Sequence, residues 1–150
     1  LVSSMGRLLR LPVNDSVLPK MGRLAQGPMT MRLLPGEELV GSLSIDVAET
    51  DPTLLLVSRK GQMTRIDLTP LRRCQRGDLG FMAVVLSADE DSVAGLCSGD
   101  SLAGIVTDQK RHGRLDTGAV ELTTAGQSWG DQLDLNSKEQ VVSVVALKTS

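Results

Sequence analysis

Aromatic side chains are almost missing from this chain, which has no Tyr, one Phe and one Trp among 150 residues. Its core must therefore be aliphatic, although an apolar content of 41% is ordinary for a folded domain. Without Tyr, the chain cannot supply a tyrosine nucleophile to a reaction. A lone Trp129 is too little for a surface on which successive bases stack, so we expect it to pack in the core or between repeats.

Cysteine and histidine are also scarce. Cys74 and Cys97 match no zinc spacing and do not make the framework of a small secreted fold, so we expect two unpaired thiols. The chain has no Gly-rich phosphate loop ending in Gly-Lys-Ser or Gly-Lys-Thr, and His112 belongs to no nucleophile motif. The acidic run at 89–91 lacks the ligand pattern of a calcium loop. We predict no catalytic residue, no metal and no cofactor.

Long apolar runs are absent as well. No stretch approaches the ~20 residues that cross a bilayer, and no secretory signal is recognisable in the sequence. We therefore expect a cytoplasmic protein with no membrane partner. Because the chain begins with Leu1 and not with Met, we also expect it to have further neighbours in its parent protein.

What the sequence does contain is a repeat. The segment 1–11 returns 55 residues later as 56–66, with Gly6 and Gly61 at matching places. Further along, the segment 27–33 corresponds to 80–86, and the segment 37–43 corresponds to 90–96. A weaker third copy begins at 105–107 and ends at 139–145. A period near fifty residues is typical of propellers and stacked arrays. We predict one all-β repeat domain with units at about 1–50, 51–100 and 101–150.

The middle unit shows how each unit is built. The apolar run 54–58 predicts a strand that is buried on both faces, Gly61 closes a tight hairpin, and 62–67 forms the return strand. Two more strands are predicted at 81–86 and 92–97, joined by an acidic turn at 87–91. Four short strands per unit and no helical period predict the blades of a propeller-like array.

Charge is segregated inside the first two units, although the net charge of the whole chain is only -2. The first half of each of these units is basic and the second half is acidic, whereas the third unit mixes its charges. If the basic halves lie on one rim, they form a positive strip suited to a phosphate backbone. The residues that we expect to contact phosphates are Arg7, Arg10, Lys20, Arg23, Arg59, Lys60, Arg65, Arg72, Arg73 and Arg76.

Three segments of the middle unit follow one another in a characteristic order: Leu56-Val57-Ser58-Arg59-Lys60-Gly61-Gln62-Met63-Thr64-Arg65, then Gln75-Arg76-Gly77-Asp78-Leu79-Gly80-Phe81, then Asp91-Ser92-Val93-Ala94-Gly95. With these segments, the unit resembles one blade of the C-terminal domain of the DNA gyrase A subunit and its topoisomerase IV relatives. The first unit resembles such a blade through 6–12 and 38–41. The resemblance implies a β-pinwheel whose blades exchange strands and whose basic edge binds and wraps double-stranded DNA in support of supercoiling. It also implies partners: the rest of an A-type subunit and an ATPase B-type subunit of an ATP-dependent type II topoisomerase, of which this chain is a non-catalytic part.

The chain departs from that family in two respects. The match to the gyrase box at 75–80 has Asp78 in place of the second glycine and Leu79 in place of a basic residue, so we interpret it as an ordinary blade loop. The family's ring has five or six blades, and we expect about three four-stranded blades here, completed by a second copy as a homodimer of half-rings or by further blades. The alternative function is a propeller-like protein-interaction module that does not bind DNA.

Overall fold

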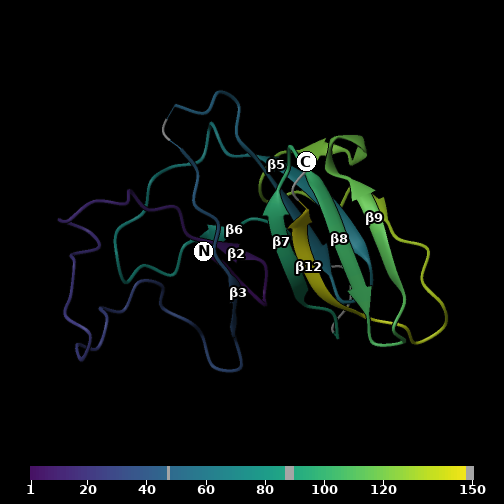
Figure 1. Ribbon diagram of the computed structural model, residues 1–150, viewed down its shortest axis with the longest axis horizontal. Coiled ribbons are helices and arrows are strands. Elements are labelled where there is room, and N and C mark those ends of the chain that lie inside the picture. Colours follow the sequence, from purple (N-terminus) through teal and green to yellow (C-terminus); the bar gives the residue numbers. More distant parts are fainter. Residues whose placement is uncertain (47, 87–89, 148–150) are drawn as a thin grey trace.

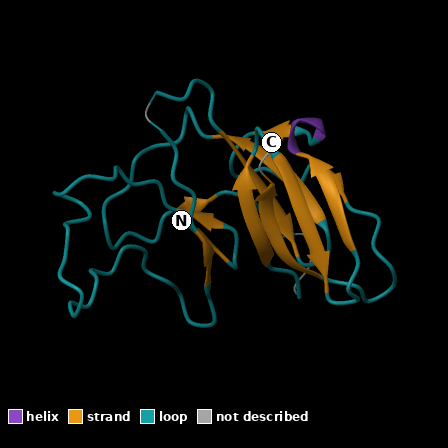
Figure 2. Cartoon of the chain, in the orientation of Figure 1, coloured by secondary structure: helices purple, strands orange, loops and turns teal. Residues whose placement is uncertain are grey.

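The computed structural model describes residues 1–46, 48–86 and 90–147, which form three small β-sheets connected by long loops (Figures 1 and 2). The strands are β1 (Val2–Ser3), β2 (Arg7–Leu8), β3 (Leu39–Gly41), β4 (Thr53–Ser58), β5 (Gln62–Asp67), β6 (Phe81–Met82), β7 (Val93–Ser98), β8 (Leu102–Thr107), β9 (His112–Asp116), β10 (Leu122–Thr123), β11 (Asp131–Gln132) and β12 (Val141–Leu147). A 3₁₀ turn, η1 (Thr117–Ala119), follows β9. No helix within the described ranges has the length and apolar character needed to cross a bilayer.

Neighbouring units exchange strands. Sheet 1 has the order β3-β1-β2-β6, and its β6 comes from the second unit, with Met82 opposite Arg7. Sheet 2 has the order β10-β5-β4-β7, with β11 also on β5, and both β10 and β11 come from the third unit. Sheet 3 has the order β12-β8-β9. Each of the first two sheets therefore needs strands from two units, as the resemblance implied.

Sheet 2 is enclosed between the other two sheets. Every residue of β4 is buried, and its side chains alternate between two cores. Leu54 and Leu56 pack in a cluster with residues of sheet 1, whereas Leu55 and Val57 pack in a cluster with residues of sheet 3. The prediction of a strand buried on both faces is confirmed. Trp129 packs against the first of these clusters, which confirms its predicted role in the core.

Two predicted features differ from the structure. The predicted strand at 81–86 is reduced to β6 and an isolated bridge at Val84, and its counterpart at 27–33 forms no strand. The reason is that this part of a unit pairs with the preceding unit, and no described residue offers an edge to 27–33. His112, expected in a turn, begins β9. In the predicted acidic turn at 87–91, residues 87–89 lie outside the described residues.

The first hairpin of every unit closes in the same way. A serine or threonine hydroxyl accepts the backbone N–H of the residue four positions later, at 3.1 to 3.2 Å, in the pairs Ser3 with Arg7, Ser58 with Gln62, and Thr107 with Arg111. The residue just before each donor has a positive φ, and it is Gly6, Gly61 or Lys110. These hairpins define the equivalent positions of the three units.

Candidate nucleic-acid interface

Two long loops pack against each other at one side of the molecule, shown at the left of Figure 1. Loop 1 covers 9–38, between β2 and β3, and loop 2 covers 68–80, between β5 and β6. Backbone hydrogen bonds join them: the N–H of Cys74 donates to the carbonyl of Arg10 (2.7 Å), that of Gly77 to Thr30 (2.8 Å), and that of Arg32 to Asp78 (3.0 Å). We call the two together the loop pair.

Five of the predicted contact residues are exposed on the loop pair: Lys20, Arg23, Arg72, Arg73 and Arg76. Two of them also have contacts within the chain. Arg76 Nη1 donates to the carbonyl of Val17 in loop 1 (3.2 Å), and the Arg72 guanidinium lies 6.0 Å from the centroid of the Phe81 ring. Loop 1 adds an exposed Arg32, which the predicted set omitted although it belongs to the basic half of the first unit.

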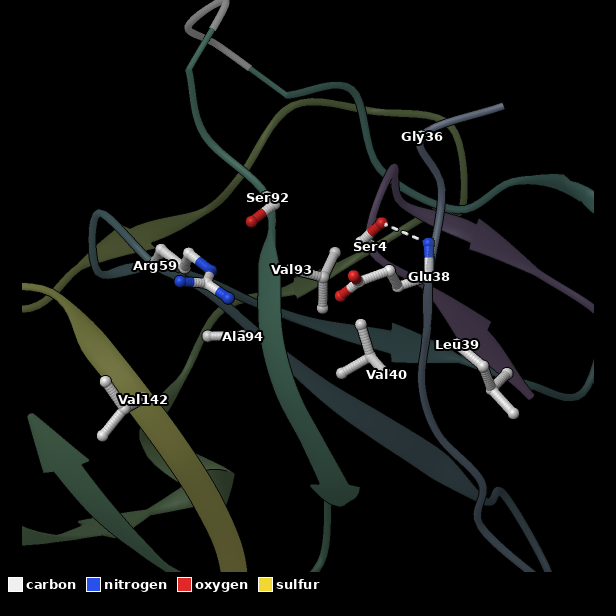
Figure 3. Close-up of a pocket in the computed structure, with 10 residues that line it drawn as sticks. All are labelled: Ser4, Gly36, Glu38, Leu39, Val40, Arg59, Ser92, Val93, Ala94 and Val142. Atoms are coloured by element: carbon white, nitrogen blue, oxygen red, sulfur yellow. Dashed lines mark hydrogen bonds between the residues drawn. The ribbon is translucent and has the colours of Figure 1, made fainter. Parts of the chain in front are cut away.

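Arg59 and Lys60 are exposed at a different place, on the turn between β4 and β5. Loop 2 begins at the other end of β5, whose six residues span about 20 Å. The basic half of the second unit therefore divides between the two ends of its sheet. Arg59 also lines a cavity of about 340 Å³ to which all three units contribute, and Glu38 lies across that cavity from it (Figure 3).

Arg7 is removed from the predicted contact set because it is only 6% exposed. Its Nε donates to Glu37 Oε1 (2.9 Å), and its Nη2 donates to the other carboxylate oxygen. Burial alone would raise the pKa of Glu37, but hydrogen bonds from Arg7, the Leu34 N–H and the Ser3 hydroxyl lower this pKa to about 2. The Glu37 carboxylate is therefore charged at neutral pH, and it is held inside the fold against the Arg7 guanidinium.

Two more predicted contacts, Arg10 and Arg65, are only partly exposed, and their guanidinium groups bind other segments of the chain. Arg10 Nη1 donates to the carbonyls of Leu68 (2.6 Å) and Leu71 (3.0 Å), which anchors the start of loop 2. Arg65 Nη1 lies 3.5 Å from the carbonyl of Gly99 and 4.0 Å from Asp100 Oδ1. Both guanidinium groups are therefore turned at least partly toward the chain's own backbone.

The acidic residue two positions before the last strand of each unit has a similar anchoring role. Glu37 binds Arg7, Asp91 Oδ1 accepts the N–H of Lys60 (3.1 Å), and Glu139 accepts Thr107 Oγ1 (2.5 Å) and Arg111 Nη1 (2.6 Å). The Thr107 hydroxyl, the Asn136 N–H and Arg111 together lower the pKa of Glu139. Sequence reasoning missed this role, although the recurrence of an acid before the closing strand was its signal.

The third unit differs from the other two at the corresponding loop. Residues 117–130 contain no Lys or Arg, so the cluster of cations is confined to the first two units. Both cysteines are unpaired, as predicted. Both are also buried, and burial raises the pKa of the Cys97 thiol to about 11. Among the described residues, no three His, Cys, Asp or Glu side chains are grouped as they would be to hold a metal ion.

Comparison with known proteins points to one kind of fold. No family model matches the chain, and no curated protein matches it. Among solved structures, the C-terminal domain of DNA topoisomerase IV superposes with a TM-score of 0.86 at 20% identity, over 99% of this chain and 46% of that one. The DNA gyrase A C-terminal domain superposes with a TM-score of 0.81 at 24% identity, over 95% of this chain and 48% of that one.

A third match is the E. coli ParC C-terminal domain, with a TM-score of 0.60 at 16% identity, over 97% of this chain and 60% of that one. The chain spans about half the length of the first two domains. The resemblance noted in the sequence is thus confirmed at the level of structure. This chain has the β-pinwheel fold of the C-terminal domains of DNA gyrase A and topoisomerase IV.

Proposed function

We propose that the chain binds the phosphate backbone of double-stranded DNA through the loop pair. The observation that carries this proposal is the gathering of exposed cations on two packed loops of adjacent units, in a protein whose net charge is -2. The contact residues are Lys20, Arg23, Arg72, Arg73 and Arg76. Long flexible cations on loops neutralise phosphates without reading base edges, so the binding is independent of sequence and sensitive to salt.

Arg59 and Lys60 form a second group of contacts at the opposite end of β5. A duplex that reaches both groups has to follow the surface of the second unit, which favours a bent path. In the parent protein, we propose that this path contributes to DNA wrapping by the A-type subunit of a type II topoisomerase. This chain would then be a non-catalytic part that works together with the rest of that subunit and an ATPase subunit.

The test is a charge reversal at Arg72, Arg73 and Arg76, measured by fluorescence anisotropy on a short duplex over a range of salt concentrations. If each cation neutralises one phosphate, the log-log slope of affinity against salt should fall in magnitude by about 2.7, since each phosphate contributes about 0.9. The loss should be the same for duplexes of different sequence, because the contacts are to the backbone.

The control is a reversal of the same size at Lys110, Arg114 and Lys138, which are exposed on the third unit. This variant carries the same net charge as the test variant, so a general electrostatic effect would weaken both equally. The proposal requires the loop 2 variant to lose more affinity and more salt dependence. Absence of duplex binding by the unaltered chain at low salt would contradict the proposal and favour a protein-interaction module.

A further inference from the structure

Two exposed arginines of loop 2, at positions 72–73, lie between two points at which the loop is held. On one side, Arg10 Nη1 donates to the carbonyls of Leu68 (2.6 Å) and Leu71 (3.0 Å). On the other side, the N–H of Cys74 donates to the backbone carbonyl of Arg10 (2.7 Å). One residue of the first unit therefore holds both ends of the short segment that carries these cations.

The points of attachment belong to well-fixed parts of loop 2. Leu68 is 5% exposed and Cys74 is 6% exposed, and the two side chains pack in different apolar clusters. Between them the loop begins with a tight turn, in which the N–H of Leu71 donates to the Leu68 carbonyl (3.2 Å) and the ring of Pro70 fixes its φ. The Arg10 side chain thus joins a preformed turn of the second unit to the first unit.

The third unit offers a comparison, because its loop lies on the second unit as loop 2 lies on the first. The N–H of Gly77 donates to the carbonyl of Thr30 (2.8 Å), and the N–H of Gly126 donates to that of Ala83 (2.7 Å). The two glycines are therefore equivalent. Counting back from them, the positions of the two arginines correspond to 121–122, which are Glu and Leu and carry no cation.

The arginine of the second unit that corresponds to Arg10 is Arg65, and it has different partners. Its Nη1 lies 3.5 Å from the carbonyl of Gly99 and 4.0 Å from Asp100 Oδ1. Among the described residues, its side chain donates no hydrogen bond to the loop at 117–130. The side-chain clamp is thus present on the loop that carries cations and is missing on the loop that carries none.

We propose that Arg10 is a positioning residue for DNA binding, which holds loop 2 so that Arg72 and Arg73 are ordered before a duplex binds. This inference rests on the proposed function and deepens it. A side chain whose backbone is already fixed loses less conformational freedom on binding, so pre-organisation strengthens binding without adding a contact. The Arg10 guanidinium itself is directed to backbone carbonyls and neutralises no phosphate.

Arg10→Gln shortens the side chain and removes its charge. In fluorescence anisotropy on a short duplex, it should weaken affinity by about tenfold, because two more side chains then have to be ordered on binding. The log-log slope of affinity against salt should stay the same, whereas the loss of a phosphate contact would lower its magnitude by about 0.9 and would contradict the proposal. Arg114→Gln, at an exposed arginine of the third unit, removes the same charge and should weaken binding much less.

A double-mutant cycle shows through which residues Arg10 acts. Arg10→Gln is introduced into a chain that already carries Arg72→Gln and Arg73→Gln, and duplex affinity is measured again. Because the clamp has no cations left to order in this chain, Arg10→Gln should have little further effect. The same loss of affinity in both backgrounds would mean that Arg10 acts independently of these arginines, and the proposal would be wrong.

Hydrogen exchange tests the clamp without DNA, so its failure is distinguishable from failure of the proposed DNA binding. In Arg10→Gln the Cys74 amide keeps its acceptor, which is a backbone carbonyl, so exchange that is faster by about tenfold would report loosening of loop 2. The Gly126 amide, bound to Ala83 in the other loop, should exchange at an unchanged rate. Equal acceleration at both amides would show a general destabilisation and would overturn the proposal.

Arg10→Lys is the conservative variant, and it serves also if the glutamine variant does not fold. It keeps the positive charge and a nitrogen that donates hydrogen bonds. Duplex affinity and the protection of the Cys74 amide should change together in this variant, since both depend on the same clamp. Full affinity with a loosened loop 2 would show that Arg10 acts through its charge alone, which the proposal does not allow.

Discussion

At the scale of single residues, the buried pair of Arg7 and Glu37 fixes the start of the chain against loop 1. The pair could not be predicted from the repeat alone, because Arg7 stands in a basic stretch that looks exposed, and its partner lies 30 residues away. A buried charge is stable in the fold only when it is paired and hydrogen bonded. The contact, and not the residue type, therefore decides which cations reach the surface.

Glu37→Gln should destabilise the protein by about 3 kcal/mol, because it leaves the Arg7 charge buried without its counter-ion. The folded-state pKa of Glu37 is about 2, below its usual 4.5, so the carboxylate stabilises the fold above pH 4.5 and loses this effect as the pH falls from 4.5 towards 2. Denaturant unfolding at several pH values measures both effects. The variant should lose much of the acid dependence, whereas Glu38→Gln, at an exposed neighbour, should retain it.

At the scale of strands, the middle unit was predictable because its apolar runs and its Gly61 hairpin are local signals. β5 covers the predicted residues, and β7 begins one residue later than predicted. The repeat alignment placed Glu37 against Glu90, but the hydrogen bonds make Asp91 its equivalent. Such a shift is hard to see in sequence, and it matters because one residue of slip moves side chains to the other face of a sheet.

The contact between β7 of sheet 2 and β12 of sheet 3 depends on a glycine. A β-carbon at Gly95 would lie 2.6 Å from Val144 Cβ and 3.1 Å from the Val144 nitrogen. Gly95→Ala should therefore destabilise the protein by about 1–3 kcal/mol through overpacking. Gly113→Ala is the matched control, since an added β-carbon there meets no atom within 4 Å.

Combining Gly95→Ala with Val144→Gly isolates the contact in a double-mutant cycle, measured by denaturant unfolding. The second change removes the side chain that the new methyl group meets, so the two effects should be less than additive. Strict additivity would show that the two sheets are not in contact at this point.

At the scale of the whole molecule, the fold could be predicted from the repeat and its resemblance to a known family. The arrangement of the cations could not be predicted. Segregated charge predicted one basic rim, but the turn at Arg59 and loop 2 lie at opposite ends of β5. Position along a strand decides which end of a blade a residue occupies, and charge counts do not contain that information. The cations of two different units are brought together because loop 1 packs against loop 2.

Because the units exchange strands, a substitution in one unit should destabilise a strand of another unit. The N–H of Leu133 in the third unit donates to the carbonyl of Gly61 in the second (2.8 Å). Leu133→Pro removes this donor and should cost about 1–3 kcal/mol more than Leu133→Ala, because the carbonyl loses its partner. Hydrogen exchange should quicken in β5 and stay slow in β8. Faster exchange confined to the third unit would contradict this account.

The exchanged strands also set an order for folding during synthesis. Sheet 1 contains β2, which ends at Leu8, but it is complete only when β6 has been made at Phe81–Met82. At a ribosomal rate of about 5–20 residues per second, the edge of β2 stays uncovered for roughly 4–15 seconds. Sheet 2 is likewise incomplete until β11 has been made. In the nascent chain, each of the first two sheets is therefore completed by strands of the unit that follows it. Until those strands have been made, the outer edge of the sheet's second strand stays unpaired.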